Sequence, residues 1–248
     1  MAGHSHWAGI KHKKAVVDAK RGKLWTKLSK AIIVAARLGG GDPAANARLR
    51  TAIADAKAVS MPKDNIERAI KRGTGELDGA NVEEILYEGY APHGVAVLCE
   101  VMTDNRNRTA PELRKLFENH GGNLGATGCV SYLFDRRGLF LIPTSAVSEE
   151  KLFEIVGEVG AEDIKLAGAQ YEVLTPPELF SAVADALESA GITCDSKQVT
   201  RIPQNTVELD VEQTRAALAF LEALDDHDDV QNVSSNLNIP DEIMANLS

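Results

Sequence analysis

The sequence has few of the cysteines that mark secreted proteins and none of the long apolar runs that mark membrane proteins. Its three cysteines, Cys99, Cys129 and Cys194, are widely spaced and lie among apolar residues. That pattern disfavours a disulfide framework and is typical of free thiols in a reducing compartment. No apolar run approaches the roughly 18 residues of a membrane span, and the N-terminus has no signal-peptide core. We expect a cytoplasmic protein that does not associate with a membrane.

Motifs for catalysis are also missing. Cys99 lies in an apolar run, no serine sits in a nucleophile elbow, and the carboxylates are dispersed over predicted helix faces. The glycine-rich residues 121–128 imitate a phosphate loop, but they follow a predicted helix and precede a predicted strand. That order is the reverse of the one that aims N–H groups at a phosphate. A turn that needs positive φ explains them better, and we expect a non-enzymatic protein without a cofactor.

Three N-terminal histidines, His4, His6 and His12, raise the question of a metal site. A free terminus Ala2-Gly-His could chelate Cu(II) or Ni(II), but no cysteine or carboxylate joins the histidines at zinc spacing. Residues 225–229, with aspartates on both sides of His227, are more typical of a solvated turn between a helix and a strand. We therefore predict no metal site.

Acidic residues are scarce in one part of the chain only. The first 75 positions hold 16 Lys and Arg against 5 Asp and Glu, a net charge of +11. The remainder holds 11 basic and 31 acidic residues, a net charge of −20. This asymmetry predicts a module that faces a polyanion, joined to a part that repels polyanions.

The positive charge begins in an N-terminal arm and continues along a helix. Residues 4–14 have no helical apolar period, so we expect an extended arm, in which Trp7 either stacks on an unpaired base or docks the arm onto the protein. Residues 15–38 have a helical period. Five cations recur along that helix within an arc of about 100°, on the side away from the apolar stripe: Lys20, Lys23, Lys27, Lys30 and Arg37.

Two further helices complete a predicted bundle. Asp42-Pro43 supplies an N-cap and a proline at the first helical position of a helix that runs to about Val59. The third helix covers residues 63–72 and stops at Gly73. Residues 15–73 are therefore expected to form a small helical bundle within a basic N-terminal domain, residues 1–80.

Beyond a glycine-rich linker the pattern alternates between strands and helices, which predicts an α+β fold. We expect strands at 85–91, 94–102, 129–134, 139–143, 163–167, 170–175, 192–202, 205–210 and 230–237, and helices at 106–120, 148–159, 177–190 and 211–224.

Residues 136–203 contain a complete ferredoxin-like set of strands and helices, flanked by two halves of another set. We predict that this ferredoxin-like domain is inserted into a discontinuous α/β domain made of residues 82–135 and 204–245. Two consecutive domains, 82–160 and 161–245, are the alternative.

Seven motifs in order carry a resemblance to a known family. They are GHSHWAGIKHKK (3–14), DAKRGKLWTKL (18–28), LGGGDPAANARLR (38–50), MPKDNIERAIKRGTG (61–75), YEGYAPHG (87–94), DNRNRTAPELR (104–114) and GGNLGATGCVSYLF (121–134). Together they resemble the YebC/PmpR family, densely over the first 140 residues and by architecture beyond. The resemblance implies a non-enzymatic protein with an N-terminal helical domain and two α/β domains. Family members are described as DNA-binding transcriptional regulators, and mitochondrial relatives act in translation.

Charge and resemblance together predict a nucleic-acid-binding regulator that contacts phosphates through residues 1–75. Arg106 and Arg108 enter a predicted helix, where they could hold a phosphate or could form a cap and surface ion pairs. The residues expected to bind nucleic acid are His4, Ser5, His6, Trp7, Lys11, Lys13, Lys14, Lys20, Arg21, Lys23, Lys27, Lys30, Arg37, Arg106 and Arg108.

The target and the other partners stay open at this stage. DNA is the leading target, and ribosomal RNA bound by a ribosome-associated translation factor is the first alternative. A small-molecule-sensing α/β module is the second, although no small-molecule substrate is expected. The acidic α/β domains are expected to engage the ribosome or a protein partner.

Overall fold

The structure is a computed structural model and describes residues 21–79 and 81–247. The described chain forms two compact units: a first unit of residues 21–129 and 216–233, and a second unit of residues 130–215 and 234–247. Helices and antiparallel strands alternate through both, so the fold is α+β, as predicted. In the described residues no helix is long and apolar enough to cross a membrane.

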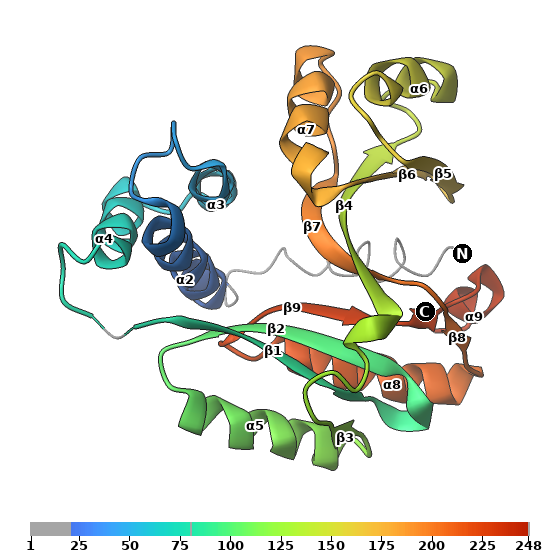
Figure 1. The fold of residues 1–248 in the computed structure, drawn as a ribbon. Helices are drawn as coiled ribbons and strands as arrows, with labels where there is room; N and C mark the ends of the chain where they lie inside the picture. Colours follow the sequence, from blue (N-terminus) through green and yellow to red (C-terminus); the bar gives the residue numbers. More distant parts are fainter. Residues whose placement is uncertain (1–20, 80, 248) are drawn as a thin grey trace. The chain divides into compact units, whose positions relative to one another are not determined.

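The first unit begins with a bundle of α2 (Arg21–Gly39), α3 (Ala47–Ala58) and α4 (Lys63–Gly73), shown in Figure 1. The apolar stripes meet in a core that includes Ile32, Leu49, Ala56 and Ile66. These helices confirm the predicted bundle, although the predicted helical residues 15–20 lie outside the described residues. At about 0.8 kcal/mol per buried CH₂, this burial accounts for most of the bundle's stability.

The predicted N-cap of α3 was wrong. Asp42 and Pro43 form a turn, in which Ala44 N–H donates to Asp42 Oδ1 at 2.9 Å, and α3 is capped by the buried Asn46. Asn46 Oδ1 accepts from Leu49 N–H at 3.1 Å, while its Nδ2 donates to the carbonyls of Ala35 and Gly40, both at 2.8 Å. An amide can cap one helix and also satisfy carbonyls at the end of another, whereas a carboxylate cannot, because it has no donor.

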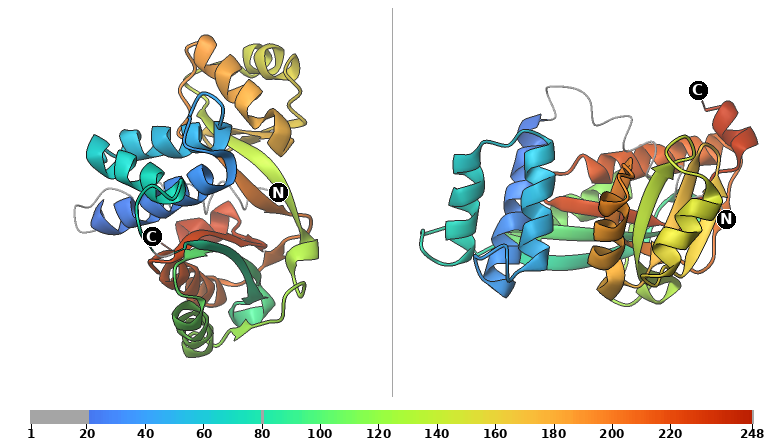
Figure 2. Two further views of the ribbon diagram at one scale, coloured as in Figure 1. Left: turned by 60° about the vertical axis from the view of Figure 1, so that its left-hand side comes forward. Right: turned by 90° about the horizontal axis from the view of Figure 1, so that it is seen from above.

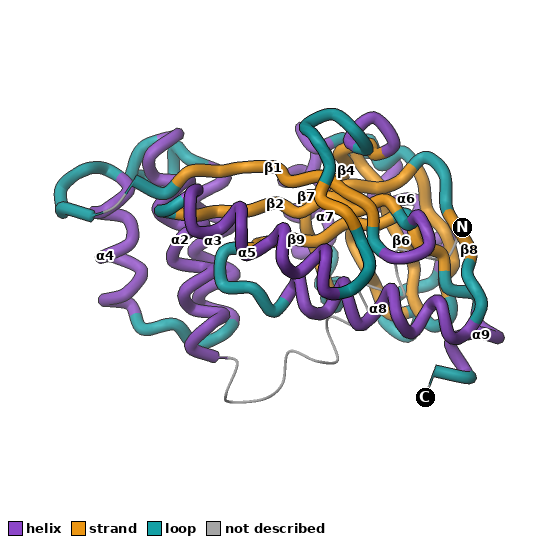
Figure 3. The backbone as a smooth tube through the Cα atoms, turned by 90° about the horizontal axis from the view of Figure 1, so that it is seen from below, coloured by secondary structure: helices purple, strands orange, loops and turns teal. Residues whose placement is uncertain are grey.

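A four-stranded sheet forms the rest of the first unit. Its order is β3-β1-β2-β9, from β1 (Glu83–Tyr90), β2 (Ala96–Thr103), β3 (Asn123–Leu124) and β9 (Val230–Ser235). Helices α5 (Arg106–Asn119) and α8 (Val211–Asp225) lie on one face of the sheet (Figures 1 and 3). The buried rings of Phe117 and Phe220 meet edge to face, with centroids 4.8 Å apart. Thus β9 is an edge strand beside β2, which precedes it by more than a hundred residues.

The strand predicted at residues 129–134 was also wrong. A short β3 occupies the edge beside β1, with Leu124 opposite Gly89. Residues 131–133 form a 3₁₀ turn, and strand β4 (Phe134–Pro143) starts only after it. The chain leaves the edge because two loop amides turn inward: Gly125 N–H donates to the Glu88 carbonyl at 2.8 Å, and Gly128 N–H to the Glu88 carboxylate at 2.7 Å. β-Propensity alone cannot register this competition.

The second unit contains an antiparallel sheet with the order β5-β6-β4-β7, from β4, β5 (Asp163–Ala167), β6 (Gln170–Thr175) and β7 (Ser196–Pro203). Helices α6 (Glu149–Gly157) and α7 (Phe180–Ser189) cover one face of the sheet (Figure 2). The stacked rings of Phe140 and Phe180 lie in the core between these layers. This strand order is that of a ferredoxin-like unit.

The remaining strands are shorter than the sequence predicted. β7 starts at Ser196 rather than at residue 192, because residues 192–195 are irregular. Of residues 205–210 only β8 (Val207–Glu208) is a strand, and it pairs in parallel with β10 (Leu237–Asn238). A short α9 (Asp241–Ala245) was not predicted. The division into three domains, with the middle one inserted, stays a prediction.

Gly73 sets the distance between α4 and α2. A Cβ at Gly73 would lie 2.5 Å from the Ile33 carbonyl oxygen and 2.6 Å from Ala36 Cβ. The oxygen belongs to helix backbone and cannot rotate away. Gly73→Ala should therefore lower the free energy of unfolding by about 1–3 kcal/mol, measured by urea denaturation. Gly22→Ala in α2, where no atom lies within 4 Å, is the control and should be neutral or stabilising. Equal stability of the two variants would contradict the close approach.

Candidate nucleic-acid interface

The predicted cationic ridge of α2 is held by another part of the same unit. Lys23 Nζ donates to the Asp226 carbonyl at 3.3 Å, Lys27 Nζ donates to the Asp225 carbonyl, and Lys30 Nζ donates to the Asp228 carbonyl at 3.1 Å. These acceptors belong to residues 225–229, which we call the aspartate segment. Donors and acceptors are 198 to 203 residues apart in the sequence.

The aspartate segment lies where α8 ends, and this explains why lysines gather there. The last carbonyls of a helix have no partner inside the helix and carry the negative end of its dipole, so ammonium groups bind them favourably. The spacing of three to four residues between the lysines places all three on one side of α2. The solvated turn predicted for residues 225–229 is therefore a docking site for α2. The sequence could not reveal this, because helix periodicity identifies a face but not its partner.

The innermost residue of the aspartate segment, Asp229, is 1% exposed. Its carboxylate accepts hydrogen bonds from Lys30 Nζ, from Thr109 Oγ1 at 2.6 Å and from Arg108 at 2.9 Å. Thr103 Oγ1 lies 3.2 Å from the same carboxylate, and Met102 N–H donates to the Asp229 carbonyl at 2.9 Å. One buried carboxylate thus joins α2, β2, α5 and the start of β9.

The charge of Asp229 follows from this surrounding. Burial raises the pKa of its carboxyl group, but the hydrogen bonds from Lys30, Thr109 and Arg108 outweigh burial and hold the pKa well below the usual range for aspartate. The hydrogen bond to Asp229 in turn raises the pKa of the Arg108 guanidinium. Asp229 is therefore ionised in the folded protein, and Lys30 is its counterion.

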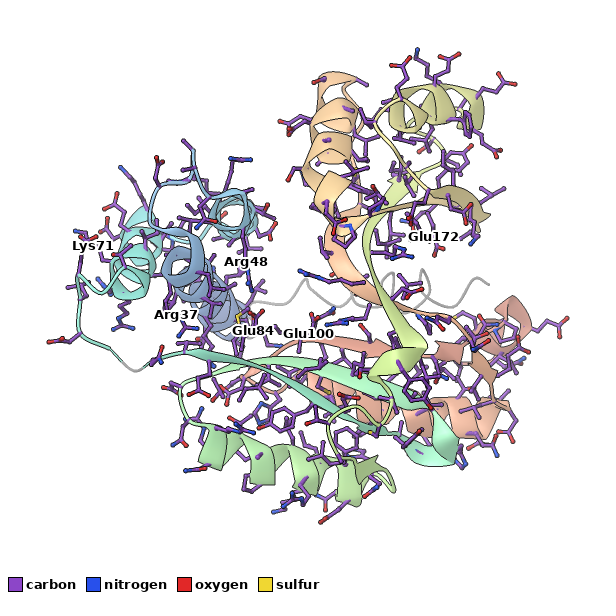
Figure 4. All side chains as sticks on the ribbon, viewed as in Figure 1. Arg37, Arg48, Lys71, Glu84, Glu100 and Glu172 are labelled. Atoms are coloured by element: carbon purple, nitrogen blue, oxygen red, sulfur yellow. The ribbon has the colours of Figure 1, made fainter. Side chains whose placement is uncertain are left out.

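An apolar contact lies beside this polar one. Val34 on α2 is fully buried against Val82 and Met102, which belong to the sheet side of the unit. A half-exposed ion pair, Arg48 with Glu84 at 2.6 Å, adds a third contact between bundle and sheet, and Figure 4 labels both residues. The bundle is thus fixed to the sheet by burial and by charge, and the exposed pair contributes least.

The other predicted binding residues divide into four groups. Arg37 donates to Asn81 Oδ1, and Arg108 pairs with Asp104 and Asp229, so both have partners. Arg106 is exposed at the start of α5. Arg21 is the first residue of α2, and the structure does not describe its side chain. The remaining predicted residues lie outside the described residues: His4, Ser5, His6, Trp7, Lys11, Lys13, Lys14 and Lys20.

A different set of cations is available on the bundle. Arg68, Lys71 and Arg72 on α4 are exposed, and their side chains have no hydrogen bond or ion pair with another described residue. They fall within about 100° of the helix circumference, opposite the buried Ile66 and Ala69. Figure 4 shows Lys71 on the side of α4 that faces away from α2. We call these three residues the α4 patch. The helical period of residues 63–72 already predicts that these cations share one face. The binding surface was assigned to α2 instead, because its run of cations is longer.

The glycine-rich loop is not such a site. Its Gly128 N–H already binds the Glu88 carboxylate, and Glu88 is 3% exposed. The Glu88 side chain thus occupies an amide that a phosphate would need. Within residues 21–79 and 81–247, no three histidine, cysteine, aspartate or glutamate side chains gather as a metal site.

Fold and site together define a class of protein: a cationic helical bundle fixed to an α+β scaffold of otherwise acidic character. Comparison with known proteins identifies the family. The model of the TACO1/YebC N-terminal domain matches residues 5–76, and the model of the TACO1/YebC second and third domain matches residues 82–237. The chain belongs to the TACO1/YebC family, which confirms the resemblance drawn from its motifs.

Close relatives span the whole chain. A protein of Rhodopirellula baltica is 60% identical over 99% of this chain and 100% of the relative, and one of Natranaerobius thermophilus is 54% identical over 98% and 99%. Both are named "Probable transcriptional regulatory protein". The crystal structure of a conserved hypothetical protein from Aquifex aeolicus is 54% identical, with a TM-score of 0.87 over 97% of this chain and 99% of that one.

The environment of Asp229 predicts how stability depends on pH. Because its pKa is lower in the folded than in the unfolded chain, where it is about 3.9, the charged group stabilises the protein above about pH 4, and this contribution is lost as pH falls below it. Asp229→Asn should lower the free energy of unfolding at pH 7 by about 3 kcal/mol and flatten the loss of stability below about pH 4. Urea denaturation at several pH values measures both effects.

The matched control is Asp228→Asn, in the same segment. The Asp228 side chain is 62% exposed and lies 3.6 Å from Lys23. Its removal should lower the free energy of unfolding by less than about 1 kcal/mol and leave the loss of stability at acid pH unchanged. Equal costs for the two substitutions at pH 7 would show that burial of Asp229 is not the source of the stabilisation.

Proposed function

We propose that this protein is a non-enzymatic, nucleic-acid-binding regulator of transcription that grips duplex DNA through its helical bundle. The observation that carries the proposal is the α4 patch, three exposed cations on one helix face whose side chains have no partner among the described residues. Phosphate binding releases counterions, and this favours any surface whose cations are not already neutralised. The lysines of α2, by contrast, already have anionic or carbonyl acceptors.

The charge of the bundle supports the same conclusion. Residues 21–75 hold 12 Lys and Arg against 4 Asp and Glu, a net charge of +8. The rest of the described chain is acidic, so the electrostatic field directs a polyanion to the bundle and away from the α/β parts. Since Lys and Arg on a helix exterior contact phosphates without reading bases, the α4 patch supplies affinity rather than sequence specificity.

DNA, rather than another polyanion, is proposed because the relatives are named probable transcriptional regulatory proteins. The N-terminal arm, with Lys11, Lys13 and Lys14, would add phosphate contacts next to the bundle. The acidic α/β parts would position the bundle and engage protein partners. Ribosomal RNA presents the same phosphates, so competition between duplex DNA and ribosomes is part of the test.

The test removes the charge of the α4 patch. Arg68→Gln/Lys71→Gln/Arg72→Gln should weaken binding of a labelled 30-base-pair duplex at least tenfold near 0.1 M salt. It should also reduce the slope of log K against log[salt] by roughly 2.7, about 0.9 for each lost phosphate contact. Fluorescence anisotropy over a salt series measures both.

The control, Lys151→Gln/Lys165→Gln/Lys197→Gln, removes the same charge from the second unit and should change neither value by as much as half. Equal weakening of both variants would mean that only net charge matters. If ribosomes displace the protein from DNA at equal phosphate concentration, the target is ribosomal RNA instead.

A further inference from the structure

The contact between α2 and the aspartate segment resembles the contact that α2 would make with a nucleic acid. Lysine ammonium groups on one helix face meet a row of oxygen acceptors: the carbonyls of Asp225, Asp226 and Asp228, and the carboxylates of Asp228 and Asp229. A phosphate backbone offers the same chemistry, a series of anionic oxygens along a line. A lysine ammonium group that is bonded to the aspartate segment cannot make the same hydrogen bonds to a phosphate.

This contact changes from weak to strong along α2. At its outer end, Lys23 and Asp228 are 3.6 Å apart, and their side chains are 57% and 62% exposed. At its inner end, Lys30 and Asp229 are in direct contact, and only 13% and 2% exposed. Exposed ion pairs contribute little and are screened by salt, whereas breaking a buried pair leaves an uncompensated charge. The outer end can therefore exchange partners while the inner end stays closed.

We propose that the aspartate segment is an intramolecular competitor of DNA. It binds Lys23 and Lys27 in the free protein and releases them to DNA phosphates when the protein binds. The proposal rests on the proposed function and adds its regulation: the α4 patch makes the first contact, and the ridge of α2 is a second, conditional one. Lys30 keeps its bond to Asp229 in both states, so the bundle stays attached to the sheet. The aspartate segment therefore weakens DNA binding, most of all for duplexes too short to reach both the α4 patch and α2.

Substitutions in the aspartate segment test the competition directly. Asp225→Asn/Asp226→Asn/Asp228→Asn leaves Asp229 and the carbonyl acceptors unchanged, but removes three negative charges from the segment that binds Lys23 and Lys27. We expect about tenfold tighter binding of the 30-base-pair duplex near 0.1 M salt. The slope of log K against log[salt] should become steeper by up to roughly 1.8. In the unchanged protein the released aspartates take up cations, which offsets the counterions that Lys23 and Lys27 displace from two phosphates.

Two controls separate competition from a general effect of charge. Glu149→Gln/Glu150→Gln/Glu158→Gln removes three exposed charges from the second unit and should change affinity less than threefold. In a Lys23→Gln/Lys27→Gln background, the aspartate substitutions should give no gain. In the otherwise unchanged protein, Lys23→Gln/Lys27→Gln should weaken binding less than threefold, because these lysines must leave their acceptors in the aspartate segment to reach a phosphate.

Each result decides the matter. A similar gain from the glutamate control, or a gain that persists without Lys23 and Lys27, overturns the competition. No gain while binding still depends on Arg68, Lys71 and Arg72 overturns it and leaves the proposed function standing. Absence of salt-dependent DNA binding by every variant overturns both. Circular dichroism verifies folding, and if the triple substitution unfolds the chain, Asp228→Asn alone should still give a two- to threefold gain.

Discussion

The arrangement of the first unit depends on one buried carboxylate. Asp229 receives hydrogen bonds from residues of α2, β2 and α5 and lies where β9 enters the sheet. A buried charge is costly unless every acceptor site is used, so these partners are fixed relative to one another by the need to satisfy it. The apolar contact of Val34 with Met102 adds affinity between bundle and sheet but little direction. The carboxylate supplies the direction.

That constraint separates two roles that looked alike in the sequence. Lysines 23, 27 and 30 form the longest cationic row, yet they serve first to attach α2 to the end of α8. The shorter row on α4 has no such task. The cations of a basic helix in an acidic protein can thus serve to bind another segment of the same chain. The intramolecular partners of each cation decide which surface is available to a polyanion.

Local patterns predicted much of the fold, and the failures have a common cause. The bundle helices and strands such as Asp163–Ala167 and Gln170–Thr175 were predictable because their apolar period is set by one buried face. The N-cap of α3, the loop around Glu88 and the role of residues 225–229 were not. Each depends on a side chain that bonds to backbone elsewhere: Asn46 to α2, Glu88 to the glycine loop, and the lysines of α2 to α8. Period and propensity describe one segment at a time, so they cannot identify such partners.

The separation of Lys30 from Asp229 by 199 residues has a consequence for synthesis. At about 5–20 residues per second, α2 leaves the ribosome roughly 10–40 s before its counterion is made. The bundle core needs only residues between Trp25 and Ile70, so it can form during that interval with its lysines still unpaired. The attachment of the bundle through Lys30 and Asp229 can form only after residue 229 has been made. A nascent chain stalled before residue 225 therefore presents the lysines of α2 before the aspartate segment exists.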